Sequence, residues 1–432
     1  MKIIDATTRA GLAALKKLNR RAEPEQATRE TVASVLEAVR ARGDAAVIEC
    51  TQRFDKAALT PKTLAVSAAE LAAAWRSQPA ATQRLLRASH RNVAAFAKAG
   101  LRKNWSQKNA QGAVVGEVYQ GFERVGLYVP GGTAPLVSTA IMTVTLAQVA
   151  GCREIVVTTP CGPDGRVNPA LLAALHLAGA TEVYRIGGIQ AIGALAFGTK
   201  TIRPVAKIFG PGNKYVIEAK RQVFGLVAID QLPGPSEVMV LADDTGEPAW
   251  IAADLVAQAE HGHGSEAILV TTSRRLAEAV QAEVAAQLQT LSRQEHLQES
   301  LAHGGCIVVA ADMEQAIATA NAYAPEHLSL IVEDEKKILP RITTSGAIFV
   351  GNHSPIAVGD YLAGPSHTLP TGGAGKSFPG LTVDQFQRRT SVVKLNAASI
   401  KKSAPLVKGL SDLEGLDAHG RSAMIRLDCP TI

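Results

Sequence analysis

The stretch VGLYVPGG, residues 125–132, opens the part of the chain that decides the fold. Its first five residues predict a buried strand, and the proline and glycines predict a tight turn into a helix that reaches about Ala150. The same strand–loop–helix order returns with glycine-rich loops at 187–193 and 210–213. Strands that alternate with helices predict a parallel sheet with right-handed crossovers.

The three glycine-rich loops directly follow predicted strands. In parallel sheets, ligands bind beyond the carboxyl ends of the strands, where glycine lets the backbone approach a phosphate and the next helix offers free N–H groups. The loops therefore favour a nucleotide or dinucleotide site. The alternative is that each glycine only makes a tight turn. The GxGxxG spacing is absent and no acidic residue stands out at the ribose position, so a conventional dinucleotide fingerprint is not met.

A second series of strands and helices follows a predicted hinge at Pro233–Pro235. A chain of 432 residues is too long for one ordinary core. We predict an α/β protein with two incomplete, variant Rossmann-like parallel-sheet domains, N-terminal helices and a C-terminal dimerising tail. The expected segments are 1–112 (helical region), 113–235 (first domain), 236–380 (second domain) and 381–432 (tail). In the second domain we expect strands at 238–242, 267–271, 306–310, 328–333 and 347–350, and helices at 248–261, 274–289 and 313–323.

Composition and charge narrow the class of protein. Apolar residues make up 47% and charged residues 19%, as in ordinary globular proteins. The formal net charge of +6 is spread along the chain, and aromatic residues make up only 4%. Proteins that read nucleic acids concentrate basic residues and interleave aromatics, so we expect no nucleic-acid partner. A mild attraction for small anions fits the charge better.

The cysteines and the N-terminus predict a cytoplasmic protein. No CxxC pair occurs, which is typical of free thiols in a reducing compartment. The first residues lack a signal-peptide hydrophobic region. The sequence also has no run of 18 apolar residues, which a membrane span would require. The cysteines are Cys50, Cys152, Cys161, Cys306 and Cys429.

Gln258 and His261 stand near the end of the helix that is expected to begin at Pro248 and stop at Gly262. Residues three apart share one helical face, and an amide oxygen and an imidazole can both bind a metal. Alone, the pair is weak evidence. A histidine near a helix C-terminus is favoured by the helix dipole and is usually only a cap or a surface residue.

Ionisable residues also stand at the ends of other predicted elements. Glu326 and His327 lie between a helix and a strand and form a candidate acid/base pair. Asp360 lies in a long Gly/Pro-rich loop, and His419 lies in the tail. With the amide and imidazole of the preceding helix, these two residues make a nitrogen and oxygen ligand set that suits zinc, manganese or cobalt. Spacing along the chain does not show that these residues meet.

Several blocks of sequence, in one order, resemble the histidinol dehydrogenase family from about residue 25 to residue 427. The blocks are GLYVPGG (126–132), GGIQAI (187–192), IFGPGN (208–213), GPSE (234–237), QAEH (258–261), APEHL (324–328), HTLPT (367–371) and EGLDAH (414–419). The resemblance implies a homodimer with shared active sites, in which Glu414 and His419 come from the tail of the other subunit. It also implies one zinc ion per subunit, bound by Gln258, His261, Asp360 and His419.

The resemblance further implies that Tyr128, Gln190 and Asn213 contact NAD. A variant Rossmann-like domain would explain the absent GxGxxG spacing. The resemblance also implies a set of residues that hold the substrate, with Ser138 and His367 as weaker candidates. This set is Ser236, Gln258, His261, His327, Asp360, Glu414 and His419.

The implied reaction is the last step of histidine biosynthesis. L-histidinol would be oxidised to L-histidine by two NAD⁺ through a bound L-histidinaldehyde. His327 would take the hydroxyl proton, and Glu326 would then activate the water that attacks the aldehyde. Zinc would act mainly as a template that orients the substrate.

Departures from the family pattern occur at DQLPG (230–234), in the loop 373–376, and at His263, an extra imidazole that we expect at the surface. One rival hypothesis is a related zinc- and NAD-dependent dehydrogenase of another small polar alcohol, such as a sulfonated diol. Glu414 argues against it, because a carboxylate repels a sulfonate. Another rival is a metal-stabilised dimer or nucleic-acid-binding protein without catalysis, which the scattered charge disfavours.

Overall fold

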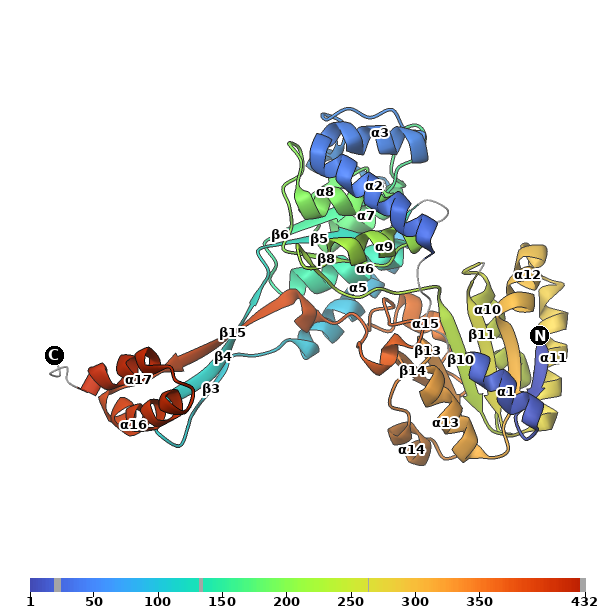
Figure 1. Cartoon of the computed structure of the whole chain (residues 1–432). Coiled ribbons are helices and arrows are strands. Elements are labelled where there is room, and N and C mark those ends of the chain that lie inside the picture. The colour runs from blue at the N-terminus through green and yellow to red at the C-terminus, as the bar shows by residue number, and fades with distance from the viewer. Residues whose placement is uncertain (19–24, 132–134, 263, 428–432) are drawn as a thin grey trace.

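The computed structural model describes residues 1–18, 25–131, 135–262 and 264–427. Over these ranges the chain forms two six-stranded sheets and one three-stranded sheet, all accompanied by helices (Figure 1). The predicted α/β class with two parallel-sheet domains is confirmed. His263, Cys429 and residues 132–134 of the first glycine-rich loop lie outside the described residues.

The first sheet carries the three glycine-rich loops. Its strands run in the order β2–β7–β6–β5–β8–β9, and all pairs are parallel except the edge pair β2–β7. The strand order reverses between β5 and β8. The strands are β2 (Ala65–Val66), β5 (Arg124–Tyr128), β6 (Glu154–Thr158), β7 (Glu182–Tyr184), β8 (Lys207–Phe209) and β9 (Ala228–Ile229), and the helices are α6 (Val137–Val149), α7 (Pro169–Ala178), α8 (Gly188–Phe197) and α9 (Lys214–Val223).

The second sheet repeats this arrangement. Its order is β1–β12–β11–β10–β13–β14, with parallel pairing throughout. Strands β10, β11 and β12 correspond to β5, β6 and β7, and strands β13 and β14 correspond to β8 and β9, so the two sheets share one architecture. The strands are β1 (Lys2–Asp5), β10 (Glu237–Ala242), β11 (Glu266–Thr271), β12 (Gly305–Val309), β13 (His327–Ile331) and β14 (Ala347–Val350). The helices are α10 (Pro248–Ala259), α11 (Arg274–Leu288), α12 (Gln294–Gly304), α13 (Met313–Tyr323), α14 (Glu335–Ile338) and α15 (Ile356–Tyr361).

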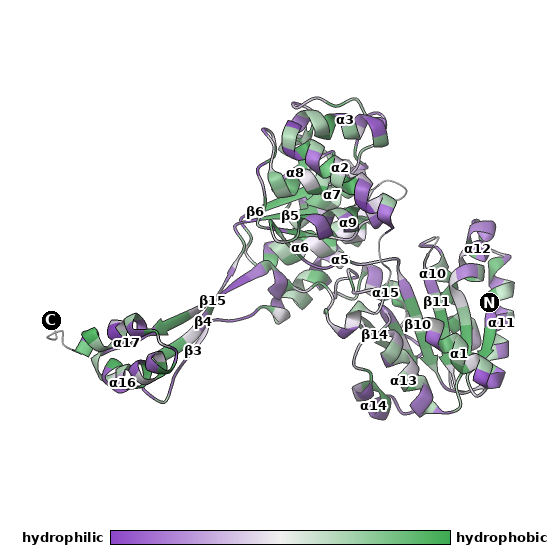
Figure 2. Cartoon of the chain, in the orientation of Figure 1, coloured by the Kyte–Doolittle hydropathy of each residue, from purple (hydrophilic) through white to green (hydrophobic). Residues whose placement is uncertain are grey.

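Local sequence explains these elements. The strands β10 and β11 are buried along their whole length and are mainly hydrophobic, as strands covered on both faces must be (Figure 2). The expected strands agree with the observed ones to within two residues at each end. The helix that was expected to reach His261 ends at Ala259, because Gly262 adopts a φ of +94° that stops a helix.

The first 112 residues do not form a separate helical region. They contribute β1 to the second sheet and β2 to the first sheet, in addition to their helices. These two edge strands are too short to leave a periodic hydrophobic pattern in the sequence. The helices are α1 (Arg9–Leu18), α2 (Gln26–Arg42), α3 (Asp44–Phe54), α4 (Ala68–Ser77) and α5 (Ala80–Gly100).

The tail forms an arm that projects from the body (Figure 1). It combines β3 (Trp105–Lys108), β4 (Val114–Gly121) and β15 (Gln387–Lys394) with α16 (Ala397–Leu413) and α17 (Asp417–Met424). Residues 114–121 therefore belong to the arm and not to the first sheet. Large apolar side chains are exposed on the arm, including Leu410 and Leu413 at 63% and 85%. Its role in dimerisation stays a prediction.

The described cysteines, Cys50, Cys152, Cys161 and Cys306, are free thiols. Among the described helices, none has the length and apolar character needed to cross a membrane.

Candidate active site

The predicted acid/base residues lie at the amino edge of the second sheet. His327 is the first residue of β13, and Ser236 directly precedes β10. Helix α10 runs back from the carboxyl edge, so its last turn brings Gln258 to the amino edge, and His261 follows in the next turn. Helix α15 returns in the same way after β14 and carries Asp360 in its last turn. The second domain thus gathers six predicted site residues at one edge.

Glu326 is a buried carboxyl group with two donors on one oxygen. The Ser236 hydroxyl and the Glu237 backbone N–H donate to Glu326 Oε2 at 2.7 Å and 2.9 Å. Burial raises the pKa of Glu326, while His327 and these two donors oppose the shift. A carboxyl group whose pKa lies closer to neutrality than usual is suited to general acid/base work.

His327 is held between two carboxylates. Its Nδ1–H donates to the Glu237 carbonyl oxygen at 3.0 Å, which directs Nε2 toward Asp360 Oδ1 at 3.5 Å. Burial lowers the pKa of His327, but Glu326 and Asp360 outweigh burial and raise that pKa to about 9. A divalent cation beside Asp360 would oppose this protonation, because it repels a second positive charge.

His261 and Asp360 are in the protonation states that a metal site needs. Burial lowers the pKa of His261, which keeps the imidazole neutral. Burial alone would raise the pKa of Asp360, but His327, His367 and His261 together lower it and keep the carboxylate ionised. The amide of Gln258 is buried, and its Nε2 has no hydrogen-bond partner among the described residues. Neutral imidazole and ionised carboxylate are the forms that bind metal ions.

The part of the chain that the structure describes does not contain a complete metal site. In the described ranges, no group of three or more His, Cys, Asp or Glu side chains is arranged to hold a metal ion. Gln258, His261 and Asp360 offer nitrogen and oxygen donors that suit zinc. His419 lies on α17 and is exposed, and Glu414 is the exposed C-cap of α16. The three donors at this edge suit zinc and would need a further ligand to complete a four-coordinate site.

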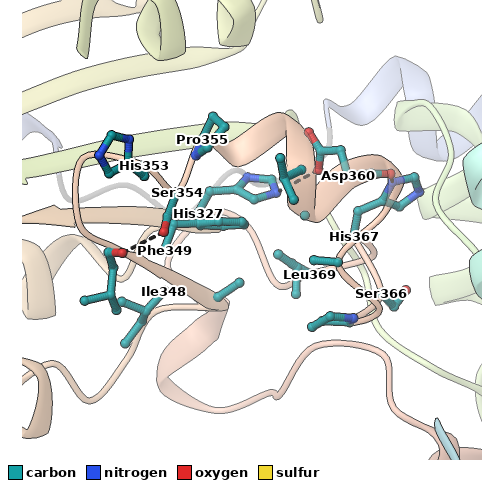
Figure 3. Close-up of a pocket in the computed structure, with 16 residues that line it drawn as sticks. His327, Ile348, Phe349, His353, Ser354, Pro355, Asp360, Ser366, His367 and Leu369 are labelled. Carbon is teal, nitrogen blue, oxygen red and sulfur yellow. Dashed lines mark hydrogen bonds and ion pairs between the residues drawn. The ribbon is translucent and has the colours of Figure 1, made fainter. Parts of the chain in front are cut away.

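A cavity of about 310 Å³ borders His327, Asp360 and His367. Figure 3 shows His327 and Asp360 pointing toward one another, with His367 beside Asp360. The ring of Phe349 lies 6.1 Å from the His327 ring and forms part of the wall. A cavity of this size admits a small metabolite.

His367 connects the two domains. Its Nδ1–H donates to the Asp360 carbonyl oxygen at 3.1 Å, and its Nε2 lies 2.9 Å from the hydroxyl of Thr139 in α6. The Ser89 hydroxyl of α5 donates to the Tyr361 carbonyl oxygen at 2.6 Å. Helices α5 and α6 therefore hold the segment that carries Asp360. These contacts show His367, which the sequence suggested as a weaker substrate ligand, in a bridging position.

The predicted cofactor residues lie at the carboxyl edge of the first sheet. Tyr128 ends β5, and its hydroxyl accepts from Gly188 N at 3.3 Å. Burial raises the pKa of Tyr128 to about 12, so the hydroxyl stays protonated. Gln190 is 1% exposed, and neither end of its amide has a partner among the described residues. Asn213 Oδ1 caps α9, which leaves its exposed amide nitrogen as a donor.

Sequence reasoning missed Thr139, Glu237 and Thr371. Glu237 Oε1 accepts from Gly372 N at 2.8 Å, and the Thr371 hydroxyl accepts from Gly234 N. These bonds tie the loop after His367 to the hinge between the domains. Glu237 and Thr371 stand inside family-like blocks and could have been noticed there, whereas Thr139 had no signal.

Comparisons with known proteins relate nearly the whole chain to one family. A family model described as histidinol dehydrogenase matches residues 18–427. A histidinol dehydrogenase of Syntrophotalea carbinolica is 46% identical over 404 residues, which is 94% of each chain. The crystal structure of histidinol dehydrogenase from Elizabethkingia anophelis matches with a TM-score of 0.94 at 35% identity, over 99% of this chain and 98% of that chain. An acetylating aldehyde dehydrogenase from Geobacillus thermoglucosidasius shares the fold, with a TM-score of 0.50 at 16% identity over 89% of this chain and 94% of that chain.

Proposed function

Since the chain belongs to the histidinol dehydrogenase family, we propose that it oxidises L-histidinol to L-histidine through bound L-histidinaldehyde with two NAD⁺. By family it is an oxidoreductase of histidine biosynthesis. One observation supports the chemistry most directly. A buried carboxyl group and a buried imidazole, Glu326 and His327, stand side by side at the edge where Asp360 and His261 also lie.

His327 is the proposed base for the alcohol step. Its Nδ1–H is engaged by the Glu237 carbonyl oxygen, so Nε2 is the atom that exchanges a proton with the substrate hydroxyl. Glu326 is the proposed base for the aldehyde step, in which it takes a proton from the attacking water. Ser236 and the Glu237 N–H fix its Oε2 for this purpose.

NAD would accept a hydride in each of the two oxidation steps. Tyr128, Gln190 and Asn213 are proposed to hold it at the carboxyl edge of the first sheet. The support is that neither end of the Gln190 amide has a hydrogen-bond partner among the described residues, and that Asn213 is exposed at the start of α9. The N-termini of α8 and α9 at this edge favour the negative charge of phosphate groups.

Zinc would orient the imidazole and amino groups of the substrate. Its proposed ligands are Gln258, His261, Asp360 and His419 of the partner subunit, and Glu414 of the partner subunit would bind the substrate amine. The proposal of a homodimer with shared sites is supported by the exposed apolar arm, which carries both tail residues away from their own active-site edge. We propose a cytoplasmic location, since four described cysteines are free thiols.

The test is the stoichiometry of the reaction. Incubation with L-histidinol and excess NAD⁺ should give about two NADH for each histidinol consumed, because a primary alcohol loses four electrons on its way to a carboxylate. L-histidine should appear in equal amount to the histidinol lost. A yield of one NADH per substrate would contradict the proposed oxidation of the aldehyde. Faster turnover of a sulfonated diol than of histidinol would instead favour the rival substrate, which the comparisons do not support.

A further inference from the structure

The loop Gly210–Asn213 occupies a special place in the first sheet. It leaves β8 beside β5, at the point where the strand order reverses, and it leads into α9. Gly210 has a φ of +110°, and a Cβ on it would lie 2.1 Å from the Tyr128 carbonyl oxygen. Only glycine therefore fits against the end of β5. Open α/β sheets bind ligands at this reversal point.

One buried ion pair binds both backbone polar groups of Gly210. The side chains of Lys220, in α9, and Asp230, directly after β9, form this pair and are fully buried. Lys220 Nζ donates to Gly210 O at 2.9 Å, and Gly210 N donates to Asp230 Oδ2 at 2.7 Å. Asp230 Oδ1 also accepts from Gln231 N at 2.6 Å and from Lys220 Nζ.

Stability alone is a poor explanation for this pair. Burying two charges carries a large desolvation penalty, and apolar replacement of such pairs is often neutral or stabilising. Charge-assisted hydrogen bonds to a backbone, in contrast, hold one conformation firmly. A loop with two glycines samples many conformations unless its neighbours restrain it.

We propose that Lys220 and Asp230 are positioning residues for the cofactor, which hold the loop Gly210–Asn213 in the conformation that receives NAD. This inference rests on the proposed use of NAD. When the loop is already ordered, NAD binding does not have to supply the free energy for ordering it. The pair therefore increases the affinity for NAD. Neither residue contacts the acid/base pair of the second domain, so Lys220 and Asp230 should not affect the proton-transfer steps.

The first test is Lys220→Met, with Arg124→Met as its matched control. Arg124 is also a buried cation of the first sheet, but it pairs with Glu154 and Glu182 at the opposite, amino edge. Lys220→Met should raise KM for NAD roughly tenfold or more, with KM for histidinol and zinc content unchanged. Arg124→Met should lower Tm without this rise. An equal rise in both variants would assign the effect to general destabilisation and overturn the proposal.

A double variant keeps the test decisive if Lys220→Met fails to fold. Lys220→Met with Asp230→Asn removes both charges together and leaves no lone buried ion. The asparagine oxygen can still accept from Gly210 N, whereas Gly210 O loses its donor. KM for NAD should again rise several-fold. A folded double variant with the wild-type KM would overturn the proposal.

Direct calorimetric titration with NAD, without histidinol, separates this inference from the proposed reaction. Wild-type protein that binds NAD but does not oxidise histidinol would contradict the reaction, and weaker binding by the variants would still support the loop's role. Normal turnover together with unchanged NAD affinity in the variants would contradict only the role of Lys220 and Asp230.

Discussion

The two parallel sheets share one strand order but present opposite edges to the site. The first sheet presents its carboxyl edge, with Tyr128 and the glycine-rich loops. The second presents its amino edge, with Glu326 and His327 directly before and at the start of β13. The bond between Thr139 of the first domain and His367 of the second joins the two edges. A duplicated architecture has thus produced two different chemical surfaces.

Helix direction explains the difference. At the carboxyl edge of the first sheet, α6, α8 and α9 begin, and the positive ends of their helix dipoles favour anions. At the amino edge of the second sheet, α10 and α13 end, and the negative ends of their helix dipoles favour cations. The first edge therefore suits the phosphates of a dinucleotide, and the second suits a divalent ion and a cationic substrate.

Metal removal should separate the two edges most strongly. Chelation should abolish histidinol oxidation, because the substrate loses its template at the amino edge, while NAD affinity at the carboxyl edge stays the same. Activity assays and calorimetric NAD titration before and after chelation would measure this. Added zinc should restore activity. Full activity after complete metal removal, verified by elemental analysis, would contradict the metal role.

Replacing His327 with asparagine should have the next largest effect. Loss of the proposed base should lower kcat by about 100- to 10,000-fold, with little change in KM for NAD. The matched control is His353→Asn, since His353 borders the same cavity but is exposed. Steady-state kinetics and circular dichroism would compare the two variants. If His327→Asn keeps the wild-type rate while the reaction still depends on Glu326, the base of the alcohol step must be a residue other than His327.

At the carboxyl edge, Gly210→Ala should raise KM for NAD roughly tenfold, because the new Cβ collides with the Tyr128 carbonyl and displaces the loop. Gly225→Ala is the control. Gly225 also has a positive φ, +100°, but a Cβ there meets nothing within 4 Å. It should lower stability by only about 1–2 kcal/mol, from backbone strain alone. The same KM for NAD in both variants would show that the collision does not matter.

The smallest expected effect concerns the pH dependence of stability. Burial raises the pKa of Asp254, one turn before Gln258 in α10, to about 6. Because the pKa is higher in the folded state than in the unfolded state, the ionised carboxylate destabilises the folded protein. This loss of stability is absent below the unfolded-state pKa, grows as the pH rises toward 6 and is complete above it. Asp254→Asn should therefore stabilise the protein by about 1–2 kcal/mol near pH 7.5 and by less near pH 4.

Urea unfolding at the two pH values would measure this difference. Asp55→Asn provides the comparison in the first domain, where burial also raises the pKa of Asp55 to about 6. Its effect should have the same sign but be smaller, because Asp55 is less deeply buried than Asp254 and solvent screens its charge more. A stabilisation by Asp254→Asn that does not change with pH would contradict the assigned cause.

Much of the first sheet could be predicted, because β5 and its glycine-rich loop stand in a continuous local pattern. The edge strands β1 and β2 could not, since two to four residues leave no periodicity and their partners lie far along the chain. The site shows the same division. The spacing of Gln258 and His261 was visible locally, although it was weak evidence by itself, whereas the bridge from His367 to Thr139 spans 228 residues. The placement of Glu414 and His419 at a partner's site stays a prediction.

By itself, the sequence determined the alternation of strands and helices, the glycines at the strand ends and the residue types available for chemistry. These features are local, because burial periodicity and turn chemistry act over a few residues. Only the tertiary structure decided that the two sheets meet by opposite edges, that His367 bridges them, and that Lys220 and Asp230 enclose Gly210. Those outcomes depend on packing between distant segments, whose energies no short stretch of sequence contains.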